Sequence, residues 1–429
     1  MADLSVEVCG LEFKNPVVSA SDDFGGDVRM VERALKQGIG GLVTKCIHKD
    51  IGSERWPRPY FFPLKRFDMP NAMICQEMFS HIKYDKWVKT EGPKVIEKCK
   101  ECDVRVIVNI AGKGAETGED KESWQRVAKD QEAMGAEALE LDIGGPHGVF
   151  GQPEQIKVAA SMGVDPEKAA RVTRWVKEVA DIPVIPKMTP LAAITDVGFG
   201  VQKAGADAVT ANNALYGIFI DHETGSFYGT PACCGYLTRD FLPFSLAKVL
   251  ELTTSLKIPV LGCGGIWNYE DAIRYVMAGC PIVQVSSAKY FKGSSVLKGI
   301  IDGLNKYCDE KGYKSTEEFR GIVKEQIKFI RDLPREKEII SPWVLPSSLM
   351  PKFDMKKCTG CLICERMCPY NAITVDKEKS NKVNDKYCMG CGMCVGACPE
   401  NAITLIERKT GEEIWNGRGT AKFKEWDKE

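Results

Sequence analysis

A cysteine pattern that occurs twice near the end of the chain limits what this sequence can fold into more than any other feature. The segments CTGCLICERMCPYNAIT (358–374) and CMGCGMCVGACPENAIT (388–404) both have the spacing C-x2-C-x2-C-x3-C-P. In this spacing, three thiolates bind one 4Fe-4S cluster and the cysteine before the proline binds the other cluster. The expected ligand sets are Cys358, Cys361, Cys364 and Cys398 for one cluster, and Cys388, Cys391, Cys394 and Cys368 for the other.

Zinc and disulfide bonds explain the pattern less well. A zinc site would use two pairs of cysteines and leave those before the prolines without a role, and disulfides are rare in cytoplasmic proteins. We expect a cytoplasmic location because the start, MADLSVEVCG, lacks the basic and apolar regions of a secretion signal, and no run of about 18 apolar residues occurs. The pattern therefore predicts a small α+β ferredoxin domain of the bacterial two-cluster type at residues 353–406, followed by a tail at 407–429.

The preceding part of the chain alternates between short apolar runs and amphipathic helical patterns. The apolar runs are NPVVSAS, GGLVTKCI, RVIVNIAG, ALELDIG, PVIPKMTP, AVTANNA, PVLGCGGI and IVQVSSA. Helical periodicity is clear at 121–136 and at 165–180, where Asp165 is a typical N-cap before Pro166. Eight strands that alternate with helices predict an α/β fold, a closed parallel (β/α)8 TIM barrel over residues 1–308, with its site at the carboxyl ends of the strands.

The charge of the chain gives no indication of a nucleic-acid or membrane partner. Its 429 residues include 58 basic and 59 acidic side chains, for a formal net charge of −1, so no strong field would attract either surface.

Between the two domains, residues 309–352 predict a helical segment and a linker. This segment is expected to pack on the barrel, or on a neighbouring subunit of a homo- or hetero-oligomer, through apolar residues at helical spacing: Phe319, Ile322, Val323, Ile327 and Ile330.

Iron-sulfur clusters of this kind transfer single electrons, so the barrel should hold a redox cofactor. The glycine-rich segment GCGGIW (262–267) follows the seventh strand, and QVSSA (284–288) follows the eighth. Barrel enzymes commonly bind a phosphate group at this point through backbone N–H groups, which fits flavin mononucleotide (FMN). No G-x-G-x-x-G motif opens a helix after a strand, so a nicotinamide dinucleotide site is not expected.

Two lysines stand at the carboxyl ends of apolar strands, Lys45 in LVTKCI and Lys187 in IPKMTP. A buried ammonium group is costly unless a negative group compensates it. The anionic N1 and C2 carbonyl edge of a reduced flavin is one such partner. An ion pair with a barrel carboxylate is the alternative.

The segments VTK, KMTP, GCGG and PHG, together with the double cysteine pattern, give the chain a resemblance to the dihydroorotate dehydrogenase family. It looks most like the catalytic part of the dihydropyrimidine dehydrogenases, in which an FMN barrel precedes a two-cluster ferredoxin domain, and the resemblance covers roughly residues 1–406. The resemblance implies electron exchange with a separate protein, either a ferredoxin or an NADH-dependent flavoprotein subunit. It also implies FMN contacts at Ser19, Ala20, Lys45, Lys187, Gly235, Gly264, Gly265, Ser286 and Ser287, with Asn109 and Asn213 near the flavin and the substrate.

The loop after the fourth strand, LELDIGGPHG (139–148), departs from these relatives. They carry Asn, Ser, Cys and then Pro-His in this loop, and their cysteine donates or accepts the proton, whereas Asp142 and Gly145 stand in this chain. The Asn-Thr pair that holds a pyrimidine in the relatives becomes Asn213 and Ala214. The negative charge of Asp142 would repel an anionic ring. An ionised carboxylate also only accepts hydrogen bonds, whereas the Asn of the relatives offers both a donor and an acceptor. We therefore expect a non-pyrimidine substrate.

The proton step then needs another group. A histidine titrates near neutral pH, so His147 in the same loop is the first choice. The other candidates at the same face of the barrel are Cys75, Cys233, Cys234, Tyr216 and His48. Each of these residues also has an explanation without a catalytic role. The cysteines could be small buried apolar residues, Tyr216 could form part of a wall, and His48 could be a hydrogen-bonded loop residue.

Two classes of function remain open. In the expected one, the protein is an enzyme that reduces or oxidises a C–C or C–N bond of a small substrate, with electrons relayed through the clusters and a catalytic set of His147, Asp142, Asn213 and Cys75. In the other class, the barrel keeps FMN only as a relay inside a larger redox complex. A true dihydropyrimidine dehydrogenase subunit is the remaining alternative.

Overall fold

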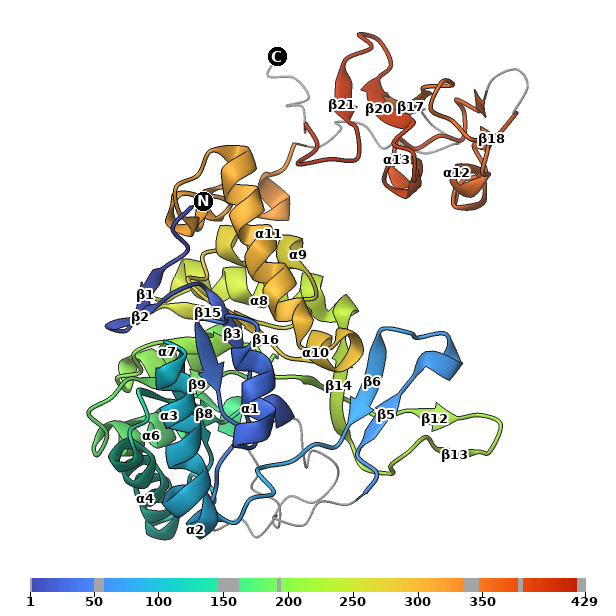
Figure 1. The fold of residues 1–429 in the computed structure, drawn as a ribbon. Coiled ribbons are helices and arrows are strands. Elements are labelled where there is room, and N and C mark those ends of the chain that lie inside the picture. The colour runs from blue at the N-terminus through green and yellow to red at the C-terminus, as the bar shows by residue number, and fades with distance from the viewer. Residues whose placement is uncertain are drawn as a thin grey trace. The chain divides into compact units, whose positions relative to one another are not determined.

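The computed structural model of the chain describes residues 2–49, 58–145, 162–190, 194–334, 347–376 and 381–422. The chain forms two compact units, Met1–Gln326 and Ile327–Glu429, which are drawn in Figure 1 and are described in turn. Among the helices of the described residues, none is long and apolar enough to span a lipid bilayer.

The first unit is built on a closed barrel of eight parallel strands, as the sequence predicts. The strands follow one another around the barrel in chain order, and β16 closes it against β3 with Val283 opposite Val17. Most strand residues are buried, which is usual for parallel strands covered by helices. The strands are β3 (Val17–Ser19), β4 (Gly41–Val43), β7 (Arg105–Ile110), β8 (Ala138–Asp142), β9 (Val184–Lys187), β10 (Val209–Ala211), β15 (Val260–Cys263) and β16 (Val283–Val285).

Amphipathic helices cover the outside of the barrel (Figure 1). Both helices predicted from periodicity are confirmed. Helix α4 begins with a capping box between Thr117 and Asp120, and α6 follows Asp165, whose carboxylate accepts two backbone N–H groups. Their apolar faces join the strands in one large core. The helices are α1 (Val28–Leu35), α3 (Gly92–Glu101), α4 (Gly118–Met134), α6 (Pro166–Lys177), α7 (Ile194–Lys203), α8 (Leu242–Ser255), α9 (Tyr269–Met277), α10 (Ser287–Lys292) and α11 (Ser295–Lys311).

A short hairpin packs against one end of the barrel interior. Its antiparallel strands are β1 (Val6–Val8) and β2 (Leu11–Phe13). Phe13 and the valines of β1 form an apolar cluster with barrel residues such as Val18 and Ile107. The hairpin comes directly before the first barrel strand and therefore covers the end of the barrel where the strands begin. The opposite end, where the strands have their carboxyl ends, remains for the site.

An antiparallel sheet of four strands, which the sequence analysis did not predict, grows from the connections after β4 and β10. The strands pair in the order β11–β14–β6–β5, and Cys75 lies opposite both Phe61 and Gly235. A small hairpin of β12 (Ile220–Asp221) and β13 (Ser226–Phe227) lies between β11 and β14 in the chain (Figure 1). The strands of the sheet are β5 (Phe61–Pro63), β6 (Ala72–Cys75), β11 (Leu215–Gly217) and β14 (Cys234–Thr238).

The second unit is a small α+β fold. One sheet joins β17 (Leu349–Phe353), β20 (Ile403–Glu407) and β21 (Glu413–Trp415). The other elements are the short helices α12 (Ile363–Arg366) and α13 (Met393–Ala397) and the hairpin of β18 (Ile373–Thr374) and β19 (Lys382–Val383). The expected tail at 407–429 is corrected here, because β21 pairs with β20 and buries Ile414 in the core of the unit.

The predicted segment at 309–352 also needs correction. Helix α11 runs on to Lys311, and the helical elements that the structure describes between it and residue 334 are three short 3-10 turns: η5 (Thr316–Phe319), η6 (Lys324–Gln326) and η7 (Ile330–Asp332). The predicted helical stripe is wrong because Gly321, with φ of +77°, interrupts the helical path and donates its N–H to the Val276 carbonyl of α9. As a result Phe319 is buried while Ile330 is 81% exposed. The first unit ends at Gln326 instead of residue 308.

Candidate active site

A cavity that opens to solvent lies at the carboxyl ends of the barrel strands, with about 1170 Å³ of empty space, open solvent included. Residues from all the barrel strands or the loops after them contribute to its wall, together with residues of the added sheet. Ser19 is the one predicted FMN contact that does not line the cavity, and its Oγ accepts a hydrogen bond of 2.6 Å from Lys289 Nζ. The predicted contacts that line it are Ala20, Lys45, Asn109, Lys187, Gly235, Gly264, Gly265, Ser286 and Ser287.

Glu140, in the middle of β8, is the centre of a buried hydrogen-bond network beside the cavity. Its Oε1 lies 3.2 Å from Lys187 Nζ and 2.7 Å from Asn109 Nδ2. Its Oε2 accepts hydrogen bonds from Thr210 Oγ1 at 2.7 Å and from Gln284 Nε2 at 2.8 Å. Burial would raise the pKa of Glu140, but Lys187 and these donors hold it below its ordinary value. The ion pair with a barrel carboxylate, one of the two partners considered for Lys187, is therefore present.

Lys45 is paired in the same way with Glu77, which follows β6 of the added sheet. Glu77 also accepts a hydrogen bond of 3.2 Å from the Tyr290 hydroxyl and interacts with the carboxyl group of Asp23. Burial, followed by the charge of Glu77, raises the pKa of Asp23 to about 8. Asp23 therefore holds a proton at neutral pH. The sequence analysis missed both acidic residues, since nothing local to MICQEMF marks Glu77 as a partner of Lys45.

A third buried ion pair was also missed. Lys289 of α10 is almost fully buried, and its Nζ lies 2.9 Å from Asp22 Oδ2. Ser286 Oγ donates to the same oxygen at 2.7 Å. Burial is the main cause that lowers the pKa of Lys289, although Asp22 opposes it. The adjacent acids in SASDDFGG were the only local signal for this pair.

Asp142 ends β8 and lines the cavity. Asn213 Nδ2 donates to Asp142 Oδ1 at 3.1 Å, and the thiol of Cys46 is a second hydrogen-bond partner. Burial is the main cause that raises the pKa of Asp142, with Lys187 acting in the opposite direction. Cys46 also lines the cavity, although the sequence analysis did not consider it. Two residues of the expected catalytic set, Asp142 and Asn213, are thus in direct contact.

The remaining proton-transfer candidates are spread out. His147 lies outside the described residues. Cys75 lines the cavity, with its thiol 3.7 Å from Glu77 Oε2. His48, Tyr216, Cys233 and Cys234 do not line the cavity.

The residues around the cavity fit FMN. Asn109 Oδ1, Asn212 Oδ1 and Gln284 Oε1 are buried and have no hydrogen-bond partner among the described residues. Buried polar atoms are nearly always paired, so these acceptors suit the N–H groups of a ligand such as a flavin. Gly264 and Gly265 have φ values of +124° and +68°, which favour glycine. Their bare backbone, with Ser286 and Ser287, would hold the phosphate, while Asn109, Lys187 and Gln284 would hold the ring.

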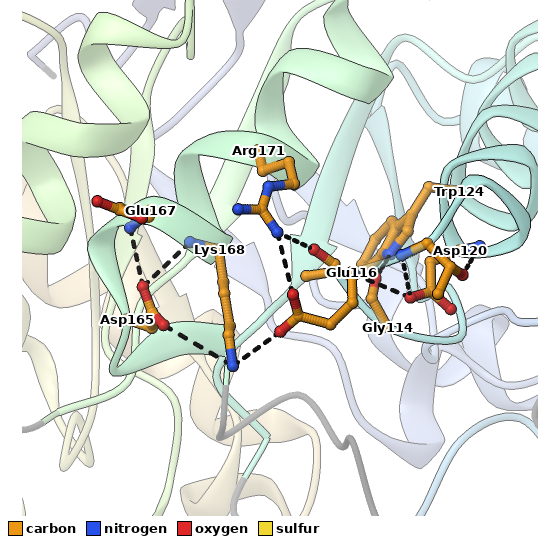
Figure 2. A network of polar contacts seen from close by, with 10 residues as sticks. Gly114, Glu116, Asp120, Trp124, Asp165, Glu167, Lys168 and Arg171 are labelled. Atoms are coloured by element: carbon orange, nitrogen blue, oxygen red, sulfur yellow. Dashed lines mark hydrogen bonds and ion pairs between the residues drawn. The ribbon is translucent and has the colours of Figure 1, made fainter.

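A network of polar contacts anchors the loop that follows β7, the strand that carries Asn109 (Figure 2). Glu116 lies 2.9 Å from Lys168 Nζ and 3.1 Å from Arg171 Nη1. Arg171 also donates to the Ala115 carbonyl at 2.7 Å. Both basic residues belong to α6, so the network joins the β7 loop to the start of α6. None of these residues lines the cavity, so the network belongs to the frame around the cavity and not to its wall.

In the second unit, the repeated cysteines surround two separate cavities of about 350 and 340 Å³. Each cavity combines three cysteines of one repeat with the cysteine before the proline of the other, which is the crossed arrangement expected from the spacing. Four thiols around a cavity of this kind fit a 4Fe-4S cluster. The first cavity is lined by Cys358, Cys361, Cys364 and Cys398, and the second by Cys388, Cys391, Cys394 and Cys368.

A flavin-binding barrel followed by a domain for two 4Fe-4S clusters defines a flavin and iron-sulfur oxidoreductase. The chain belongs to the dihydroorotate dehydrogenase family, whose family model, described as dihydroorotate dehydrogenase, matches residues 3–308. A second family model, described as a 4Fe-4S dicluster domain, matches residues 357–402. The protein is therefore an oxidoreductase of the class that acts on CH–CH bonds, and its cofactors are FMN and 4Fe-4S clusters.

Several curated relatives share about 30% of their residues with this chain, and each is named as the catalytic subunit of dihydroorotate dehydrogenase B (NAD(+)). The relative from Pyrococcus furiosus is 33% identical over 324 residues, which cover 75% of this chain and 98% of the relative. The relative from Pyrococcus abyssi is 32% identical, with 75% and 99% covered. The relative from Methanocaldococcus jannaschii is 29% identical, with 75% and 98% covered.

Proposed function

We propose that the protein reduces or oxidises a C–C or C–N bond of a small, non-pyrimidine substrate and exchanges the electrons with a separate protein. When bound, FMN supplies hydride chemistry at carbon and single-electron exchange with the clusters. The residues of the chain bind the substrate, exclude water and move the proton. The observation that carries the proposal is the Asp142–Asn213 contact in the cavity wall.

The buried charges support a substrate without a carboxylate. In the described part of the first unit, the buried lysines are each balanced by a carboxylate: Lys45 by Glu77, Lys187 by Glu140 and Lys289 by Asp22. Asp142 adds one more acidic group to the wall. An anionic ring such as dihydroorotate would lose water there without gaining a cation of its own. A neutral or cationic substrate that donates a hydrogen bond fits better.

Asn213 is the residue that positions Asp142. Its Nδ2 group donates to Asp142, and its Oδ1 accepts the backbone N–H of Ala214 at 2.7 Å. Both ends of the amide are therefore engaged within the protein. Asp142 is left to contact the substrate with its remaining lone pairs.

The proton step has two candidates of different kinds. His147 remains the first choice because imidazole titrates near neutral pH. Asp142 is the second, since burial raises its pKa and the carboxyl group lines the cavity. Burial raises the pKa of Cys75 well above its ordinary value, which keeps this residue a neutral thiol.

The electron partner is a ferredoxin or a flavoprotein subunit. The two-cluster domain supports this assignment. The relatives are named as catalytic subunits of dihydroorotate dehydrogenase B (NAD(+)), which also supports a separate partner subunit. The sequence carries no dinucleotide fingerprint of its own. The isolated chain should therefore oxidise NADH slowly and accept electrons readily from reduced ferredoxin or a viologen.

The substrate assignment can be tested on anaerobic holoenzyme reduced with a viologen. Orotate, uracil and thymine are compared with a panel of unsaturated amides, amidines and imines as oxidants of the reduced flavin. We expect the best panel compound to react at least about 100-fold faster than the pyrimidines, because the Asp142 carboxylate has no hydrogen to donate to a pyrimidine carbonyl group and would leave that group unpaired. Asp142→Asn should narrow this difference. Equal rates for uracil and the best panel compound would refute the proposal, and unchanged selectivity in Asp142→Asn would remove Asp142 from it.

A further inference from the structure

The two cluster sites come from repeats of one sequence, so residues thirty positions apart can be compared directly. We name Cys358, Cys361, Cys364 and Cys398 the first cysteine set, and Cys388, Cys391, Cys394 and Cys368 the second cysteine set. The potential of a 4Fe-4S cluster depends on nearby charge, on hydrogen bonds to sulfur and on exposure to solvent. A charge found beside only one set would therefore make the reduction potentials of the two clusters different.

Arg408 is tied by hydrogen bonds to the segment that carries the second cysteine set and to Ser347, which packs against its loop. Its Nη1 donates to Asp385 Oδ1 at 2.7 Å, and its Nε donates to the Ser347 carbonyl at 2.7 Å. Asp385 comes three positions before Cys388 in the chain. The side chain of Ser347 touches the loop of the second set, since its Oγ lies 2.5 Å from the point where a Cβ of Gly390 would stand.

The charge of Arg408 is only partly cancelled by its partner. The Arg408 side chain is 18% exposed, whereas that of Asp385 is 64% exposed. Water therefore screens the carboxylate more than the guanidinium, so the Arg408–Asp385 pair contributes a net positive field. Arg408 Nη2 is buried and has no hydrogen-bond partner among the described residues.

Near the first cysteine set, exposed side chains carry charges of both signs, since Arg366 Nη2 donates to the Cys361 carbonyl at 3.5 Å. Glu400, after the Cys-Pro pair, lines the first cavity, whereas the equivalent Tyr370 lines the second. In the sequence, the residue thirty positions before Arg408 is Glu378, which lies outside the described residues. Asn381 Nδ2 lies 3.3 Å from Cys358 Sγ and favours reduction of the first cluster. A neutral amide has a weaker effect than a largely buried full charge.

We propose that Arg408 and Glu400 give the two clusters different potentials, so that the cluster of the second cysteine set accepts the first electron. Reduction adds one negative charge to a cluster and changes no bond. The guanidinium stabilises that charge at the second set, and the carboxylate disfavours it at the first set. The electron comes from the reductant, and no proton is needed. This inference does not depend on which substrate the barrel binds.

The test is an anaerobic redox titration of the full-length holoprotein with dithionite, in which the reduced clusters are followed by EPR. We expect two one-electron steps in the wild type. Arg408→Gln should move the higher step to more negative potential and leave the lower step in place. Glu400→Gln should move the lower step to more positive potential and leave the higher step in place.

Arg408→Lys distinguishes the effect of the charge from a structural effect. It keeps the positive charge but loses the pair of hydrogen bonds that Nε and Nη1 of Arg408 donate. Its higher step should stay near the wild-type value, while Arg408→Gln shifts it. Two steps that respond to neither Arg408→Gln nor Glu400→Gln would overturn the proposal, as would a shift of only the lower step in Arg408→Gln. If Arg408→Gln loses iron, Glu400→Gln decides the matter, since Glu400 is exposed and its replacement should not disturb folding.

Discussion

Lys187 Nζ lies 3.2 Å from Glu140 Oε1 inside the barrel, where the Glu140 side chain has no exposed surface. Removing one member of such a pair leaves the other charge buried alone, which costs about 3–5 kcal/mol. We expect Glu140→Gln to lower the free energy of unfolding by about this amount. The double variant Glu140→Gln/Lys187→Met should recover part of the loss, since no lone charge remains. Denaturant unfolding of the three proteins measures this, and a double variant less stable than Glu140→Gln would contradict the ion-pair interpretation.

Asp23 should make the fold less stable as the pH rises. Its pKa is raised from 3.8 to about 8, so between these values the folded chain holds a proton that the unfolded chain releases. Stability therefore falls as the pH rises through this range and levels off above about pH 8. Asp23→Asn should flatten this dependence. Unfolding of both proteins between about pH 5 and 9 tests the point, and parallel curves would show that Asp23 does not hold the proton.

The crossed cysteine sets predict a specific loss of iron. Cys398→Ala should disturb the cluster of the first cysteine set and lower the iron content from about eight to about four per chain. Cys102→Ala is a matched control, because Cys102 is an exposed cysteine outside the repeats. Iron analysis of anaerobically purified protein gives the result. Full iron content in Cys398→Ala would show that the ligand assignment is wrong.

His147 should affect only the half-reaction with the substrate. If it supplies the proton, His147→Asn should slow that half-reaction by about 10²- to 10⁴-fold. Reduction of the protein by a viologen should keep its wild-type rate. Stopped-flow measurement separates the two half-reactions. Equal slowing of both would make His147 structural, and no slowing of either would move the proton step to Asp142 or favour the relay function.

The barrel and the cysteine sets were predictable because their signals are local. Runs such as RVIVNIAG and LELDIG are strands by composition alone, and the cysteine spacing determines which thiolates share a cluster. The buried ion pairs were not predictable in the same way. Lys289 and Asp22 are 267 residues apart in the chain, and Lys45 meets Glu77 only because the added sheet carries Glu77 over the barrel. That sheet was missed because its strands come from two connections far apart in the chain, after β4 and after β10, and pair only in the folded protein.

The exchange of one cysteine between the repeats also fixes the order in which the ligand sets are completed as the ribosome makes the chain. The second cysteine set needs Cys368 and is complete once Cys394 has been added. The first cysteine set begins earlier, with Cys358, yet it waits for Cys398. The repeat that is synthesised first is thus the last to obtain all its ligands, and a chain that stops before Cys398 cannot complete the first set.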